Sequence, residues 1–303
     1  MTRGKRPRRR VPQPDAAQPN ALDAPETEKL QKALADLGYG SRREMEQWIA
    51  AGRVQVNDVV ASLGSRVTPA DAITVDGRPA GRATPGTAPA EGCRVLVMNK
   101  PAGVICTRRD PEGRPTIFDD LPRLRQGRWI SVGRLDIQTS GLLLLTNDGA
   151  LAHRMMHPST GLDREYAVRV NGRLEEAQLE QLIAGVEVDG EELRFSDIQY
   201  YNGSGMNHWY HVVLMEGRNR EVRRLFESMA LTVSRLKRVR FGPVVLPSTL
   251  RSGRCMEIGD ADLKALYQLL ELPLTLPRRG RRRSRDVAEK SLLIPYPELQ
   301  LPG

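Results

Sequence analysis

The chain has 303 residues, 40% of them hydrophobic and 27% charged, which is the composition of a globular protein long enough for two domains. Its 46 Lys and Arg against 37 Asp and Glu leave a net charge of +9, which predicts a polyanionic partner; a basic surface without a specific partner is the alternative. Three scattered cysteines disfavour a disulfide framework, and no apolar stretch could serve as a signal peptide or span a bilayer, so we expect a cytoplasmic protein.

The N-terminal part predicts a tail and a small domain. Residues 1–25 are rich in Arg, Pro, Gln and Ala, and we expect a disordered basic tail. Within 26–80, apolar residues at helical spacing predict one helix, and Ser41 with Glu44 forms a capping box for a second. Alternating apolar residues then predict short strands in the second half of this domain.

Two small helices followed by short strands, with arginines near the helix ends, resemble the alpha-L RNA-binding fold that is shared with a small-subunit ribosomal protein. The resemblance covers residues 26–80 and implies that Arg42, Arg43 and Arg53 contact RNA. The alternative is a small helical scaffold whose arginines are only solvated.

A larger domain is expected over 93–272, after a Pro-, Gly-, Ala- and Thr-rich linker at 81–92. Runs of strands with interspersed helices, but no regular βαβ alternation, predict an α+β fold with a mostly antiparallel mixed sheet. The expected strands are 94–98, 129–135, 141–146, 165–170, 195–201, 209–215 and 232–246, and the expected helices are 149–156, 175–184, 219–229 and 260–271. Residues 273–303, with the arginine-rich run 278–285, are expected to form a disordered basic tail that contacts phosphates.

The most informative stretch of the chain runs from Gly133 to Gly149. It begins with Gly-Arg-Leu-Asp, ending at Asp136, in a segment between two expected strands, where exposed loops usually carry catalytic side chains. Thr-Ser-Gly and the apolar run Leu142–Leu145 follow. This stretch resembles the catalytic motif of the RNA pseudouridine synthases, in which the aspartate is the indispensable catalytic residue.

Three further motifs, in the family's order, extend this resemblance over about residues 94–258. They are Asn99–Val104, which resembles the family's first motif, Arg164–Tyr166, which resembles the motif of the base-stacking tyrosine, and Glu216–Leu225, which resembles the motif of the basic partner of the aspartate. The resemblance implies that Asp136, Tyr166 and Arg223 are the catalytic residues. It also implies RNA contacts by Lys100, Arg218 and Arg220, and by Arg134, which is expected to fill the place of a flipped base or to hold a phosphate.

The reaction of this family explains the residue types. Conversion of uridine to pseudouridine breaks the C1′–N1 bond and reattaches the same base through C5, so no cofactor is expected, and the sequence has no dinucleotide or phosphate-binding glycine motif. The carboxylate must be ionised, whether it attacks the sugar, attacks the base or removes a sugar proton. A covering base raises a carboxyl pKa by desolvation, and a neighbouring guanidinium lowers it again.

Two other chemistries fit the sequence less well. His153 and His157 have zinc-ligand spacing, but a third ligand is missing, so we favour a structural role and expect no metal site. A glycosidase needs a second catalytic carboxylate, for which Glu165 and Glu221 are the candidates. Pairing with an arginine or a solvated position explains each of these glutamates more simply.

The stretches Cys106–Thr116 and Glu216–Leu225 resemble the members of this family that act on large-subunit ribosomal RNA. The resemblance therefore implies a monomeric enzyme without a cofactor that isomerises a uridine in large-subunit (23S) ribosomal RNA or in one of its assembly intermediates. The alternatives are a related synthase that acts on small-subunit ribosomal RNA and a non-catalytic RNA-binding or ribosome-assembly protein. The set Asp136, Tyr166 and Arg223 argues against the last, because a protein without catalysis has no chemical need for all three.

Overall fold

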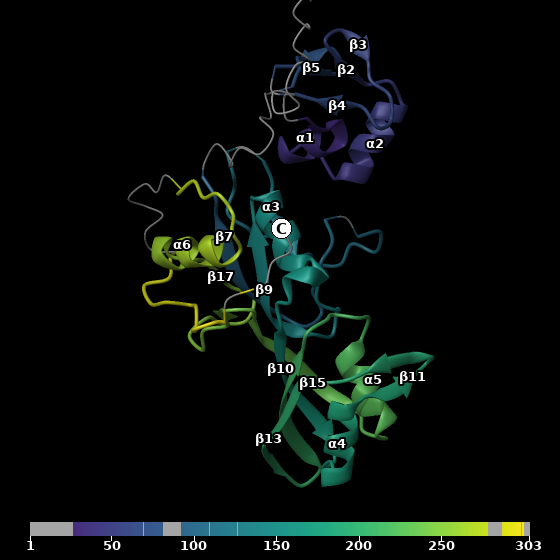
Figure 1. Cartoon of the computed structure of the whole chain (residues 1–303), viewed down its shortest axis with the longest axis vertical. Coiled ribbons are helices and arrows are strands. Elements are labelled where there is room, and N and C mark those ends of the chain that lie inside the picture. The colour runs from purple at the N-terminus through teal and green to yellow at the C-terminus, as the bar shows by residue number, and fades with distance from the viewer. Residues whose placement is uncertain are drawn as a thin grey trace, which may run out of the picture.

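The computed structural model describes residues 27–68, 70–80, 92–108, 110–125, 127–277, 287–297 and 299. Figure 1 shows a small N-terminal unit with α1 and α2, and an elongated larger unit built around a long sheet. The expected N-terminal tail, nearly all of the linker and the arginine-rich run 278–285 lie outside the described residues.

The N-terminal unit packs two helices against short strands, as expected. At the start of α2 the predicted capping box is present, because Glu44 N donates to Ser41 Oγ (3.1 Å) and Ser41 N donates to Glu44 Oε2 (3.4 Å). Side chains of both helices and of the strands close a separate apolar core. The elements are β1 (Glu28–Lys29), α1 (Leu30–Asp36), α2 (Arg42–Ala50), β2 (Val54–Val56), β3 (Val59–Val60), β4 (Arg66–Val67), β5 (Ile73–Val75) and β6 (Arg78–Pro79), with sheet orders β1-β4 and β3-β2-β5-β6.

The two units touch at the loop before β8. Arg128 Nε donates to the backbone oxygen of Ala35 (3.2 Å), and burial lowers the pKa of Arg128. Gly38, which follows α1 with a φ of +95°, lies against Gly127 of the same loop, where a Cβ would be only 3.0 Å from a backbone oxygen. The end of α1 therefore contacts the larger unit directly.

A nine-stranded sheet forms the larger unit, in the order β13-β14-β10-β15-β9-β7-β17, with β16 paired to β15 and β8 paired to β9. Its strands are β7 (Val95–Lys100), β8 (Ile130–Val132), β9 (Ser140–Thr146), β10 (Arg164–Asn171), β13 (Asp197–Ser204), β14 (Asn207–Leu214), β15 (Val233–Phe241), β16 (Val244–Val245) and β17 (Cys255–Glu257). Among these strands only β15 and β9 pair in parallel. The expected α+β class with a mostly antiparallel mixed sheet is confirmed.

The centre of the sheet is buried on both faces. Along β9, Leu143 and Leu145 enter one apolar core, whereas Leu142 and Leu144 enter the other. This explains the continuous apolar run in the sequence, because a strand that is covered on both sides needs no polar face.

The four expected helices of the larger unit are confirmed, and they cover the two cores. Helices α4 (Glu176–Ala184) and α5 (Glu221–Ser228) pack on the first core, and α3 (Gly149–Met156) and α6 (Asp260–Leu269) pack on the second. No helix in the described part of the chain is long and apolar enough to cross a membrane.

The sequence analysis missed three short strands. β11 (Val186–Val188) and β12 (Glu191–Leu193) form a separate hairpin, and β17 pairs with the edge of β7. Three-residue strands that carry charges show too little alternation to be recognised. The strand expected at 232–246 is divided into β15 and β16, because the chain turns at Gly242, whose φ is +52°.

The expected disordered tail 273–303 is wrong for the described residues 287–297, which pack against the larger unit. Leu292 is 5% exposed within the second core. The Tyr296 hydroxyl donates to Asp163 Oδ1 (2.7 Å). The folded unit therefore continues beyond the arginine-rich run, because the apolar residues after that run complete the second core.

We expect Leu292→Ala to lower the free energy of unfolding by about 2–5 kcal/mol, because it leaves a cavity in the second core. Ile294→Ala removes as much apolar volume from the same segment, but Ile294 is 40% exposed and its replacement should cost much less. Urea unfolding of the full chain measures both variants. Equal losses for the two variants would contradict the packing of this segment.

Candidate active site

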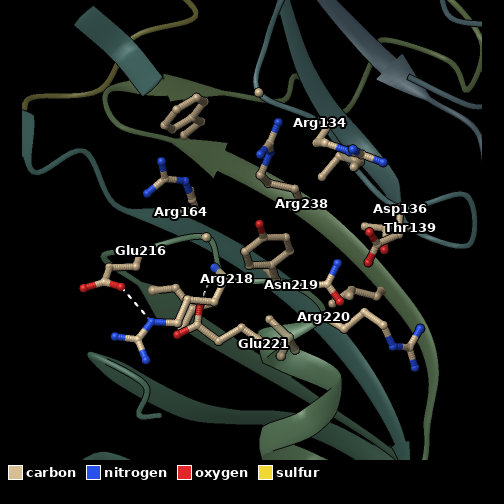
Figure 2. Close-up of a pocket in the computed structure, with 18 of the residues that line it drawn as sticks. Arg134, Asp136, Thr139, Arg164, Glu216, Arg218, Asn219, Arg220, Glu221 and Arg238 are labelled. Carbon is tan, nitrogen blue, oxygen red and sulfur yellow. Dashed lines mark hydrogen bonds and ion pairs between the residues drawn. The ribbon is translucent and has the colours of Figure 1, made fainter. Parts of the chain in front are cut away.

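A cavity of about 600 Å³ opens where β9, β10 and β15 meet the loop before α5 (Figure 2). Most of its lining residues belong to four segments: the loop 133–139 between β8 and β9, the start of β10, the loop 215–220 with the start of α5, and one face of β15. Val132, Met156, Pro158 and Leu214 complete the lining. This volume suits a ligand of nucleotide size. Residues of the expected catalytic motif thus line this cavity.

Asp136 belongs to the loop between β8 and β9, and its half-buried side chain lines the cavity (Figure 2). The backbone is fixed here, because Asp136 O accepts hydrogen bonds from Thr139 N (3.0 Å) and from Lys100 Nζ (3.2 Å). Among the described residues, no group donates a hydrogen bond to the carboxylate. Both carboxylate oxygens are therefore available to a substrate.

The structure contradicts the expectation that Lys100 contacts RNA. The residue is 0% exposed, and its ammonium donates to the backbone oxygens of Pro101 (2.9 Å), Asp136 (3.2 Å) and Thr139 (2.9 Å). Burial lowers the pKa of Lys100, and the charge of Asp136 raises it in part. Because a buried ammonium must satisfy its donors within the protein, Lys100 ties the loop of Asp136 to β7.

Tyr166 lies on β10, is 8% exposed and lines the cavity while also joining the first core. In the sheet its neighbours are Val212 on β14 and Arg238 on β15. The structure thus brings Tyr166 and Asp136 to one cavity. A rigid aromatic ring held by its core contacts is suited to support a base by stacking.

Arg223 lies on α5 but does not line the cavity, and in the described structure it forms no ion pair with Asp136. Its Nη1 donates to Val233 O (2.9 Å), and its Nε is buried without a hydrogen-bond partner. Burial lowers the pKa of Arg223, Arg220 lowers it further, and the charge of Asp136 raises it. Arg223 is therefore close enough to Asp136 to act on it through charge.

The other arginines expected to contact RNA in the larger unit are exposed and line the cavity. Arg134 has no hydrogen-bond or ion-pair partner among the described residues. Arg218 pairs with Glu216 (2.9 Å), and Arg220 lies 3.7 Å from Glu227. These partners are themselves exposed, so an RNA phosphate can compete with them.

Three expected RNA-binding arginines lie in the N-terminal unit. Arg42 and Arg43 are exposed in the first turn of α2. Arg53 is less free, because its Nε donates to Asp76 Oδ1 (2.9 Å) and its guanidinium lies 4.0 Å from the ring centre of Trp48.

The sequence analysis gave no role in the site to four buried or half-buried polar residues that line this cavity: Thr139, Arg164, Glu221 and Arg238. Thr139 Oγ1 is buried without a hydrogen-bond partner. Burial raises the pKa of Glu221, although its Oε2 accepts a hydrogen bond from Arg218 N (2.9 Å). A signal for Arg164 was present, because it lies two residues before Tyr166 and successive side chains of a strand alternate between faces.

The histidine pair has a local structural contact. The rings of His153 and His157 lie 5.4 Å apart between centres, and His157 Nδ1 lies 2.7 Å from Ser159 Oγ at the short helix Pro158–Thr160. In the described part of the chain no group of three His, Cys, Asp or Glu side chains is placed to hold a metal ion.

Comparison with known proteins shows to which family the chain belongs. A sequence model of RNA pseudouridylate synthases matches residues 94–228, and the ribosomal large subunit pseudouridine synthase B of Pseudomonas aeruginosa is 57% identical over 274 residues, which are 90% of this chain and 70% of that relative. This chain belongs to the RNA pseudouridine synthase family. The resemblance that the motifs carried is therefore confirmed.

Further matches cover the N-terminal unit and most of the chain. A sequence model of the S4 domain matches residues 28–73. The ribosomal large subunit pseudouridine synthase B of Escherichia coli (strain K12) is 51% identical over 249 residues, which are 82% of this chain and 84% of that one. A solved pseudouridylate synthase covers 78% of this chain and 99% of its own, with 26% identity and a TM-score of 0.54.

We expect Lys100→Met to reduce isomerisation by about a hundredfold, because the catalytic loop loses its internal donors and small displacements of reacting groups cost this much. The free energy of unfolding should fall by about 1–3 kcal/mol, since buried carbonyls lose their partner. RNA affinity should stay nearly unchanged. Single-turnover rates, filter binding and urea unfolding measure the three effects.

The matched control is Lys264→Met, because Lys264 is exposed on α6 and should affect none of these quantities. A Lys100→Met protein that keeps full activity and stability would show that Lys100 does not hold the loop. Weakened RNA binding with an unchanged single-turnover rate would return Lys100 to the role that the sequence analysis expected.

Proposed function

We propose that this protein converts a uridine of large-subunit ribosomal RNA to pseudouridine in the cytoplasm, with Asp136 as the catalytic carboxylate. One observation carries the proposal: the carboxylate of Asp136 lines a cavity with Tyr166 and several arginines, and no described group donates to it. Membership of the synthase family supports the reaction, and the names of the P. aeruginosa and E. coli relatives support the choice of RNA.

The reaction conserves atoms and electrons within one nucleotide. The C1′–N1 bond breaks, a C1′–C5 bond forms, and the proton that leaves C5 is balanced by the proton gained at N1. Asp136 can begin this sequence by attacking the sugar, attacking the base or removing a sugar proton, and each of these needs the anion. A carboxylate without internal donors is suited to this task because no hydrogen bond reduces its basicity.

The target nucleotide must leave its helical stack to reach Asp136. Unstacking costs a few kcal/mol, and stacking on an aromatic ring returns about 1–3 kcal/mol. Tyr166 is the ring that we propose for this, because it lies in the cavity wall and its core contacts hold it in place. Exposed Arg134 is free to occupy the vacated position or to hold a phosphate.

RNA affinity is proposed to come from both units. Arg42 and Arg43 are exposed on α2 and are free to contact phosphates. Arg218 and Arg220 beside the cavity can exchange their exposed partners Glu216 and Glu227 for phosphates. Arg53 contributes less, because two hydrogen bonds to Asp76 and the ring of Trp48 hold its guanidinium. The S4 match of the N-terminal unit supports this division.

We expect 23S ribosomal RNA from a strain without this protein to lack at least one pseudouridine, which the intact chain restores on re-expression. Asp136→Asn should not restore it, because the amide keeps the shape but is neither an anionic nucleophile nor a base. Pseudouridine mapping by carbodiimide modification measures both strains. In vitro, Asp136→Asn should bind the RNA normally and isomerise it only at background.

Two outcomes would overturn the assignment. An unchanged 23S map, with a pseudouridine lost elsewhere, would mean that the RNA is wrong. Activity of Asp136→Asn within about tenfold of the parent, a difference of about 1.4 kcal/mol in the barrier, would mean that the carboxylate is wrong.

We expect Arg223→Met to lower the single-turnover rate steeply. The reason is that the anionic carboxylate of Asp136 loses a cation that interacts with its charge. Arg224→Met is the comparison, because Arg224 binds Glu191 (2.6 Å) on the β11–β12 hairpin and does not line the cavity. Its rate per folded molecule should stay near that of the parent. An equal loss of rate in both variants would mean that Arg223 is not the partner of Asp136.

A further inference from the structure

One arginine of the cavity is buried without a counter-charge. Arg238 lies on β15, is 3% exposed and lines the cavity. Its Nε donates to Leu142 O (2.8 Å), whereas its Nη2 is buried and has no hydrogen-bond partner. Within the part of the chain that the structure describes, no carboxylate forms an ion pair with it. An isolated buried charge is costly. A ligand that brings a negative charge and a hydrogen-bond acceptor to the guanidinium of Arg238 would therefore gain binding free energy.

A second arginine lies beside it. The guanidinium carbons of Arg164 and Arg238 lie 4.9 Å and 5.1 Å from the ring centre of Phe241. The Nη1 of Arg164 donates to the backbone oxygens of Leu162 (2.9 Å) and Met215 (2.7 Å). Its Nε and Nη2 have no hydrogen-bond partner among the described residues. Figure 2 shows both arginines in the pocket, and Arg164 also lies against the loop that carries Glu216, since it donates to Met215 O.

The two guanidinium groups repel each other. Burial lowers the pKa of Arg164, and the charge of Arg238 lowers it further. Glu221 and Asp163 attract Arg164, but Glu221 already accepts a hydrogen bond from the chain before α5, and Asp163 is held by Arg240 (2.7 Å). Neither carboxylate forms an ion pair with Arg164 in the described structure. Phe241 and the sheet therefore hold the two arginines, and neither forms an ion pair with a carboxylate in the described structure.

We infer that Arg238 and Arg164 form an anion subsite that binds a backbone phosphate next to the target uridine. The inference rests on the proposed function, which supplies an RNA substrate. A phosphodiester carries the missing negative charge, and its two unesterified oxygens match the planar donor fork of a guanidinium. A neutral base edge cannot compensate two cations. Because Arg238 is the β15 partner of Tyr166, the subsite borders the place proposed for the stacked base.

The test uses a short fragment of large-subunit ribosomal RNA that contains the target uridine. In two modified fragments, the phosphate on the 5′ or the 3′ side of that uridine is replaced by a neutral methylphosphonate. Dissociation constants are measured with the full chain carrying Asp136→Asn, so that turnover does not change the RNA. We expect one of the two replacements to raise Kd about tenfold, as for a lost hydrogen bond to a charged group.

Arg238→Met should raise Kd for the unmodified fragment by a similar factor and should abolish the effect of the sensitive methylphosphonate. Arg235→Met is the matched control, because Arg235 is exposed on the same strand and does not line the cavity. This control should keep the full methylphosphonate effect. Arg164→Met should also lose the methylphosphonate effect. This second variant decides the test if thermal unfolding shows that Arg238→Met does not fold.

Two results would overturn the subsite: neither methylphosphonate weakens binding, or the folded Arg238→Met and Arg164→Met proteins remain as sensitive as the control. Isomerisation of the three fragments by the parent protein separates this failure from that of the proposed function. If the parent isomerises the unmodified fragment but one of these two results is obtained, only the subsite is refuted. A parent that isomerises no uridine of large-subunit ribosomal RNA refutes the proposed function and, with it, the inference.

Discussion

The site depends on the close parallel contact between β9 and β15. Gly141 pairs with Arg238 at a φ of +101°, and a Cβ at this position would lie under 3.0 Å from the backbone nitrogen and oxygen of Arg238. Only glycine allows this approach, because real Cβ atoms essentially never come so near to a backbone. The contact joins the loop of Asp136 to the strand of Arg238, so that residues about a hundred positions apart line one cavity.

Two buried cations, Lys100 and Arg238, pair with Gly141 from the strands on its two sides, and they differ in their hydrogen bonds. The ammonium of Lys100 finds three backbone oxygens, and it therefore stabilises the loop that carries Asp136. The guanidinium of Arg238 finds only one, and its remaining donors have no partner among the described residues. A satisfied buried charge holds structure, whereas an unsatisfied one in a cavity wall is preorganised for an anion. The same sheet thus fixes the loop that carries Asp136 and places a buried positive charge in the wall of the cavity.

The corrections to the sequence analysis share a physical cause. Lys100 lies in a motif that resembles a family of RNA enzymes, and a lysine in such a motif suggests a phosphate contact. Its burial depends on how β7 pairs with β9, which involves residues far apart in the chain. The segment 287–297 follows an arginine-rich run and has the composition of a tail, yet Leu292 is buried in the second core together with residues of α6. In both cases local sequence described the residue type, and long-range packing decided its environment.

The sequence by itself determined the helices and longer strands, the class of sheet, the family and the position of Asp136, because periodicity and motif spacing are local properties of a chain. Tertiary structure alone decided which side chains share the cavity. Arg164 and Tyr166 face it together because alternation along β10 places them on one side, but Arg238 joins them only through the pairing of β10 with β15. Arg223 forms no ion pair with Asp136 in the described structure and donates to Val233 O on β15 instead. Such distances follow from the pairing of strands and the packing of helices, which no single segment of sequence encodes.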